Sequence, residues 1–119
     1  MTDRTPRLRD FLDHLLEAIA RIERYVAPLD FDAFVADEMA QDAIIRNLEI
    51  IGEACRNMVR LDPGFAASHP DLPIRAAQEM RNVLAHGYFG VDLAVVWSTV
   101  KSHLPALAAT AREVRNRLV

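Results

Sequence analysis

Apolar side chains recur at steps of three and four residues along nearly all of this 119-residue chain. That spacing places them on one face of an α-helix, and no segment shows the strict alternation of a strand. The expected elements are a first helix from Pro6 to just before Pro28, a short turn or helix at residues 31–35, a long helix from Asp37 to Asp62, a third helix over residues 74–86, a fourth helix capped by Asp92, and a tail helix after Pro105. The sequence therefore predicts an all-α, up-down bundle of four to five helices in one domain, residues 1–119.

Residues suited to helix ends fall at the expected boundaries. Thr5 is predicted to N-cap the first helix, with Pro6 in its first position, and Asp37 and Asp92 are predicted N-caps of two later helices. Pro105 is expected to break or kink the fourth helix. Residues 63–73 hold three prolines and leave room for at most a short turn.

The composition excludes several classes of protein. A single cysteine, Cys55, cannot form an intramolecular disulfide or a cysteine-rich zinc site, and it lies in an apolar stripe where burial is expected. Four glycines give no phosphate-binding glycine motif. With no long apolar run and no apolar segment behind its charged N-terminus, the chain is expected to be cytoplasmic and without membrane contact. No metal is expected either, because no histidine pairs with another histidine or a carboxylate at the spacing of a helical metal site, and no cofactor is expected.

The charge is divided unevenly along the chain. Residues 1–53 carry 12 acidic and 6 basic side chains, and residues 54–119 carry 5 acidic and 8 basic, which gives −6 and +3 and the net −3. A net negative charge argues against gripping nucleic acid through bulk charge. The division is explained either by ordinary helix-surface charge or by a second half that meets an anion.

One histidine stands in a setting that suits chemistry. Arg81, Asn82, His86 and Tyr88 lie at the predicted end of the third helix, and Gly87 permits a sharp exit there. Five residues turn a helix by about 500°, so Arg81 and His86 converge only if the helix ends near His86. An imidazole beside a guanidinium fits metal-free cleavage of RNA, whose 2′-hydroxyl is a built-in nucleophile.

The spacing alone is weak evidence, because Arg9 and His14 repeat it inside the first helix. The alternative, without any catalysis, is a histidine placed favourably near the dipole of a helix C-terminus. The other three histidines, His14, His69 and His103, are interpreted as incidental surface or boundary residues.

The pattern Arg81-Asn82-x-x-x-His86-x-Tyr88 resembles the Arg-x4-His-x-Tyr motif of HEPN domains, and specifically of the HepT-like ribonuclease toxins. Residues 45–54, 86–92 and 96–97 resemble that family as well, and the likeness covers about residues 5–118. One departure is that Leu72-Pro73 is followed by Ile74 and Arg75, where the family often has an aromatic residue.

This resemblance implies a HEPN-like homodimer whose subunits share a cleft and cleave RNA without metal. By carry-over, Arg81 and His86 are catalytic, Asn82 supports them, and Tyr88 is the tyrosine to which a partner nucleotidyltransferase antitoxin of the MntA type (a type VII system) adds AMP. Added bulk and negative charge beside the catalytic pair would exclude RNA.

The polar face of the second long helix has two interpretations. Arg46, Glu49 and Glu53 lie opposite the apolar stripe, either as a solvated ladder of ion pairs or as the lining of the dimer cleft. Two alternatives to a ribonuclease also stay open at this point. The chain could be a non-catalytic subunit that binds a nucleotide or substrate for a partner nucleotidyltransferase, or a purely structural helical dimer.

Overall fold

The computed structural model describes residues 4–74, 77, 80 and 91–118. Within these residues all regular structure is helical, which confirms the all-α prediction. The elements are α1 (Thr5–Val26), α2 (Phe31–Ala36), α3 (Glu38–Leu61), α4 (Phe65–Ser68), α6 (Leu93–Ser98), a π-helical turn η1 (Thr99–His103) and α7 (Leu104–Arg117).

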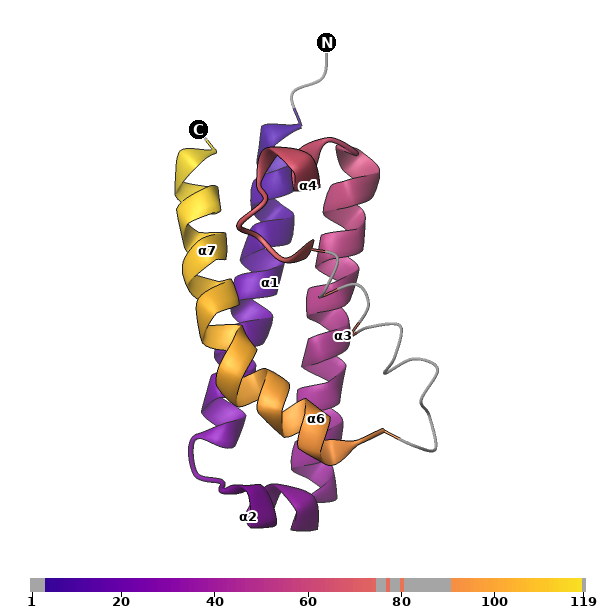
Figure 1. Cartoon of the computed structure of the whole chain (residues 1–119), viewed down its shortest axis with the longest axis vertical. Helices are drawn as coiled ribbons and strands as arrows, with labels where there is room; N and C mark the ends of the chain where they lie inside the picture. The colour runs from indigo at the N-terminus through magenta and orange to yellow at the C-terminus, as the bar shows by residue number, and fades with distance from the viewer. Residues whose placement is uncertain (1–3, 75–76, 78–79, 81–90, 119) are drawn as a thin grey trace.

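The long helices stand along the longest axis of the molecule (Figure 1). Helices α1 and α3 run antiparallel and form the largest contact, and α7 packs against α1. Helix α2 closes the end where α1 finishes and α3 begins, while α4 lies at the opposite end, where α1 begins and α7 finishes. The antiparallel pair of α1 and α3, joined by a short connection, agrees with the expected up-down order.

The predicted apolar stripes form the core. Every described long helix is amphipathic and turns its apolar face inward. The stripe of α3 is buried throughout: Ile44, Leu48, Ile51, Cys55 and Met58. It meets the buried residues of α1, Leu8, Leu12, Leu15, Ala18, Ile19, Ile22 and Val26, and those of α7, Leu104, Leu107, Ala108, Ala111 and Val114. Each large aliphatic side chain buried in this way contributes about 1.5–3 kcal/mol relative to an exposed one.

Aspartates cap three of the described helices. Asp37 accepts a hydrogen bond from the backbone N–H of Ala40 at 3.0 Å, and Asp92 accepts one from Ala94 at 2.9 Å, so both predicted caps are confirmed. Asp30 caps α2 in the same way. The predicted cap at Thr5 is wrong by one residue, because Thr5 is already helical and Arg4 occupies the N-cap. Pro6, which lacks an N–H and has a helical φ, fits in the first turn either way.

Of the predicted break or kink at Pro105, the break is wrong, because the helix continues; a π-helical turn lies just before the proline, and the ribbon bends between α6 and α7 (Figure 1). Backbone angles stay helical from Ser98 through Leu104, and α6 continues into α7 through the π-helical turn η1. Proline supplies no N–H and its ring crowds the carbonyl four residues earlier. One wider turn relieves that crowding without ending the helix, and π-helical turns of this kind occur as single insertions in α-helices.

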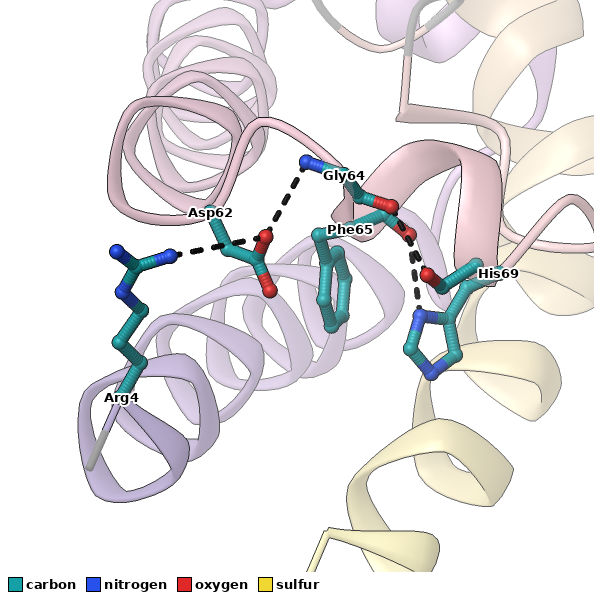
Figure 2. Close-up of polar contacts among 6 residues, drawn as sticks. Arg4, Asp62, Gly64, Phe65 and His69 are labelled. Carbon is teal, nitrogen blue, oxygen red and sulfur yellow. Dashed lines mark hydrogen bonds and ion pairs between the residues drawn. The ribbon is translucent and has the colours of Figure 1, made fainter. Parts of the chain in front are cut away.

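A small polar cluster holds the end of the bundle at α4 (Figure 2). Asp62 lies 4.0 Å from Arg4 and accepts the backbone N–H of Gly64 at 3.1 Å. Nδ1 of His69 lies 3.1 Å from the carbonyl oxygen of Phe65, and the two rings stack with centroids 4.3 Å apart. Phe65 itself is buried. His69 therefore lies at the boundary of the core as expected, but it is held by Phe65 and is not incidental.

Candidate functional site

The four motif residues, Arg81, Asn82, His86 and Tyr88, lie outside the described residues. The chain that leads to them is partly described. Ile74, Ala77 and Met80 are helical, which agrees with the predicted third helix. Ile74 is buried, and Ala77 and Met80 are half-buried against the core. Ile74, Ala77 and Met80 are spaced three residues apart, as expected for the inward face of a helix, and they directly precede the motif in the sequence.

The three expected cleft residues line one polar pocket. Arg46, Glu49 and Glu53 surround a pocket of about 380 Å³ together with Ile50, Ala54 and Asn57 of the same helix. Arg46 and Glu49 form an ion pair at 3.8 Å. Arg46 is mostly exposed, with 72% of its side chain accessible, so this pair is screened by solvent and contributes little to stability. Its side chain can consequently move to meet an anion.

Sequence reasoning missed His14 as a member of this pocket. His14 belongs to α1, is exposed, and packs edge-on against Phe11 with ring centroids 6.3 Å apart. It enters the pocket because antiparallel packing of α1 on α3 brings the middle of the one helix beside the middle of the other. Only the relative register of the two helices reveals this neighbour, and no local spacing encodes that register.

A buried asparagine, also missed, joins the same two helices. Asn47 is 5% exposed and is the only buried polar residue in the described part of the chain. Its Oδ1 accepts from Nη1 of Arg21 at 3.4 Å, and its Nδ2 donates to the carbonyl of Ala43 at 2.8 Å. Arg21 in turn lies 3.8 Å from Glu17. The amide of Asn47 is thus satisfied by one bond within α3 and by one contact across to α1.

A second and larger pocket, of about 670 Å³, lies between α3 and the helix formed by α6, η1 and α7. Its wall is mostly apolar and includes Leu48, Ile51 and Leu107. Ala77 and Met80 also face it, and Met80 directly precedes Arg81 in the sequence. Such a surface suits packing against apolar groups. The smaller pocket differs, because it is lined by the ionisable side chains His14, Arg46, Glu49 and Glu53.

The one cysteine, Cys55, is not an activated nucleophile. Burial raises the pKa of the Cys55 thiol to about 12, so this sulfur stays protonated near neutral pH. A bidentate contact with Asp13, chiefly its hydrogen bond, raises the pKa of Arg115. Among the described residues no group of three or more histidine, cysteine, aspartate or glutamate side chains could hold a metal ion.

None of the described helices combines the length and apolar character needed to cross a membrane. This finding applies to residues 4–74, 77, 80 and 91–118 alone.

Comparison with known proteins gives a consistent result. The family described as "Ribonuclease HepT-like" matches residues 15–114. The protein named probable ribonuclease HepT from Thermococcus cleftensis is 41% identical over 107 residues, which cover 90% of this chain and 94% of that protein. A candidate RNase from Caldanaerobacter subterraneus subsp. tengcongensis is 33% identical over 111 residues, covering 93% and 95%.

A third relative is longer than this chain. This protein of Methanocaldococcus jannaschii carries a name that joins gamma-glutamylcyclotransferase with a candidate RNase. It is 38% identical over 108 residues, which cover 91% of this chain but 47% of that protein. No solved structure matches the chain.

Proposed function

Because the chain belongs to the HepT-like ribonuclease family, we propose that it is a metal-independent endoribonuclease and the toxin of a cytoplasmic toxin–antitoxin pair. The observation that carries this proposal is the pattern Arg81-Asn82-x-x-x-His86-x-Tyr88 in a chain that is 41% identical to a protein named probable ribonuclease HepT. A homodimer brings two copies of the pattern into one cleft.

The proposed reaction uses the 2′-hydroxyl of RNA as the nucleophile. His86 accepts its proton, the oxygen attacks the adjacent phosphorus, and the bond from phosphorus to the 5′ oxygen breaks. An imidazolium returns a proton to that leaving oxygen, so the products are a 2′,3′-cyclic phosphate and a 5′-hydroxyl end. In a shared cleft the two copies of His86 can divide the roles of base and acid. Arg81 binds the phosphate and stabilises the charge of the transition state, and Asn82 orients these groups.

The polar pocket on α3 supports a place for RNA on this face of the helix. We assign Arg46, Glu49 and Glu53 to the lining of the dimer cleft, because all three line one pocket on the same face of α3. The exposed guanidinium of Arg46 can bind a phosphate. The carboxylates can accept hydrogen bonds from the amino groups of bases.

Tyr88 is the proposed point of control. An MntA-type nucleotidyltransferase antitoxin would join the phenolic oxygen to the α-phosphorus of ATP, with release of pyrophosphate and of the phenolic proton. The AMP group would then carry its negative phosphate beside Arg81 and repel RNA.

Growth of an expressing host tests the toxin proposal. Wild-type chain should arrest growth, and Arg81→Ala should abolish the arrest because the phosphate loses its cation. Arg9→Ala is the matched control, since Arg9 stands five residues before a histidine in the same way but lies inside α1, and it should stay toxic. Full toxicity of Arg81→Ala would contradict the assignment. A harmless wild-type chain that binds its nucleotidyltransferase would favour the non-catalytic subunit.

Intact-mass measurement tests the modification. Incubation with ATP and the antitoxin should add one AMP to the wild-type chain and none to Tyr88→Phe. The other tyrosine, Tyr25, offers a matched control, and Tyr25→Phe should be labelled like wild type. Equal labelling of Tyr88→Phe would place the acceptor elsewhere.

A further inference from the structure

The described exposed apolar side chains gather at one end of the bundle. Four large ones are more than a third exposed, and three of them lie within nine residues: Phe31 at 38%, Val35 at 45% and Met39 at 85%. They belong to α2 and the first turn of α3, and the fourth, Val95, lies on α6, which contacts α2. Single exposed apolar residues are ordinary, but a group confined to one end indicates a contact surface.

The same end is strongly acidic. Residues 27–45 hold five carboxylates and no lysine, arginine or histidine. Asp30 and Asp37 are used as helix caps. The remaining three, Asp32, Glu38 and Asp42, are exposed and form no ion pair within the part of the chain that the structure describes. We call Phe31, Val35 and Met39 with these three carboxylates the α2 surface.

The α2 surface is held rigidly on the bundle. Phe34, on the inner side of α2, is fully buried and packs on Trp97 with ring centroids 5.3 Å apart. Nε2 of Gln41 donates to the carbonyl oxygens of Phe34 and Val35 at 3.0 and 2.9 Å, which ties the start of α3 to the end of α2. The exposed side chains are thus presented on a fixed backbone, and little ordering entropy is lost when they bind.

Resting on the proposed function, we propose that the α2 surface docks the nucleotidyltransferase antitoxin, through a face that presents lysines or arginines around an apolar contact. The carboxylates repel RNA and anionic lipid, both of which are polyanions. A second copy bound through a two-fold axis would place the same carboxylates against one another. A basic protein face complements the charge and covers the apolar side chains as well.

The test measures binding between the intact chain and a purified MntA-type nucleotidyltransferase. Met39→Gln should weaken binding by about tenfold, since a buried methionine contact is lost. Glu38→Gln/Asp42→Asn should slow association severalfold at low salt, and the difference from wild type should shrink as salt is added. The matched control Asp10→Asn/Glu113→Gln removes the same two charges from exposed sites on α1 and α7 and should bind like wild type.

Several outcomes overturn the proposal. Equal binding by wild type, Met39→Gln and Glu38→Gln/Asp42→Asn would place the docking site elsewhere. If Asp10→Asn/Glu113→Gln slowed association as much as Glu38→Gln/Asp42→Asn, the effect would come from the net charge of the chain and not from the α2 surface. Self-association of the wild-type chain that Met39→Gln abolishes would make a second copy the occupant. If the wild-type chain did not bind the nucleotidyltransferase at all, both the docking role of the α2 surface and the proposed antitoxin partner would be wrong.

Ribonuclease activity of the same proteins separates this proposal from the proposed catalysis. Met39→Gln should cleave RNA at the wild-type rate while escaping neutralisation by the antitoxin. If the wild-type chain binds through the α2 surface but cleaves no RNA, docking stands and the catalytic proposal fails.

Discussion

Single residues in the core determine how the helices are joined. Asn47 links α1 and α3 through Arg21, and Cys55 fills the apolar interface between them with a fully buried thiol. The burial of Cys55 could be predicted from its place in the apolar stripe. The burial of Asn47 could not, because a polar residue beside the stripe is normally assigned to the surface, and only the position of Arg21 across the interface explains it.

The thiol of Cys55 gives a prediction about stability and pH. Its pKa is about 12 in the fold, compared with an ordinary value of 9.0 for the thiol. Below pH 9 the thiol is protonated in both states, whereas above pH 9 the unfolded chain loses the proton and the fold keeps it. Stability therefore falls as the pH rises, by about 1.4 kcal/mol between pH 8 and pH 10 from this group.

Urea unfolding of wild type and Cys55→Ala at pH 8 and pH 10 measures this effect. The substitution leaves a small cavity and lowers stability at both values, so the readout is the difference between the two pH values. Wild type should lose about 1.4 kcal/mol more than Cys55→Ala over this interval. An identical loss in both proteins would show that the thiol is not buried as described.

The helices themselves were largely predictable, because helical period and caps are local properties of the chain. Predicted caps at Asp37 and Asp92 and the end of α3 at Leu61 are confirmed. The errors fall where local signals compete. At Pro105 the helix continues through η1 with a change of direction (Figure 1), because Val100, Leu104 and Leu107 are buried in the core on both sides of the turn. Tertiary packing of this kind outweighs a local breaking signal.

The cap at Asp92 gives a prediction at the level of the element. Its carboxylate accepts from the N–H groups of Ala94 and Val95 at 2.9 and 3.4 Å. Asp92→Ala should lower the free energy of unfolding by about 1 kcal/mol, because two helix N–H groups lose their acceptor. Asp92→Asn, which keeps an acceptor oxygen, should stay close to wild type in the same urea titration. Equal stability of all three proteins would show that the cap contributes nothing.

At the scale of the whole molecule, the two ends of the bundle differ in how their charges are partnered. The start of α1 and the ends of α3 and α7 lie at one end, where Arg4, Arg115 and Arg117 pair with Asp62, Asp13 and Glu113, while the α2 surface and its three carboxylates lie at the other end (Figure 1). The acidic half of the sequence, residues 1–53, and the basic half, residues 54–119, do not correspond to the two ends of the bundle. Because neighbouring helices run antiparallel, each half of the sequence contributes residues to both ends. The net charge of −3 therefore does not describe either end.

The candidate site was predictable in part. Arg46, Glu49 and Glu53 share a helix face by spacing alone, and they line one pocket. His14 joins them from α1 through the register between two helices, which no local pattern specifies. The motif Arg81, Asn82, His86 and Tyr88 lies outside the described residues, so its geometry stays a prediction from the sequence.

The most direct test of the central claim is RNA cleavage by the purified chain in the presence of EDTA. We predict that wild type cleaves under these conditions and that His86→Ala is slower by about 10²–10⁴-fold, the range for loss of a general acid–base group. His103→Ala is the matched control, since this exposed histidine belongs to η1, and it should cleave like wild type. Cleavage by His86→Ala at the wild-type rate would contradict the account, as would a wild-type chain that cuts no RNA without metal.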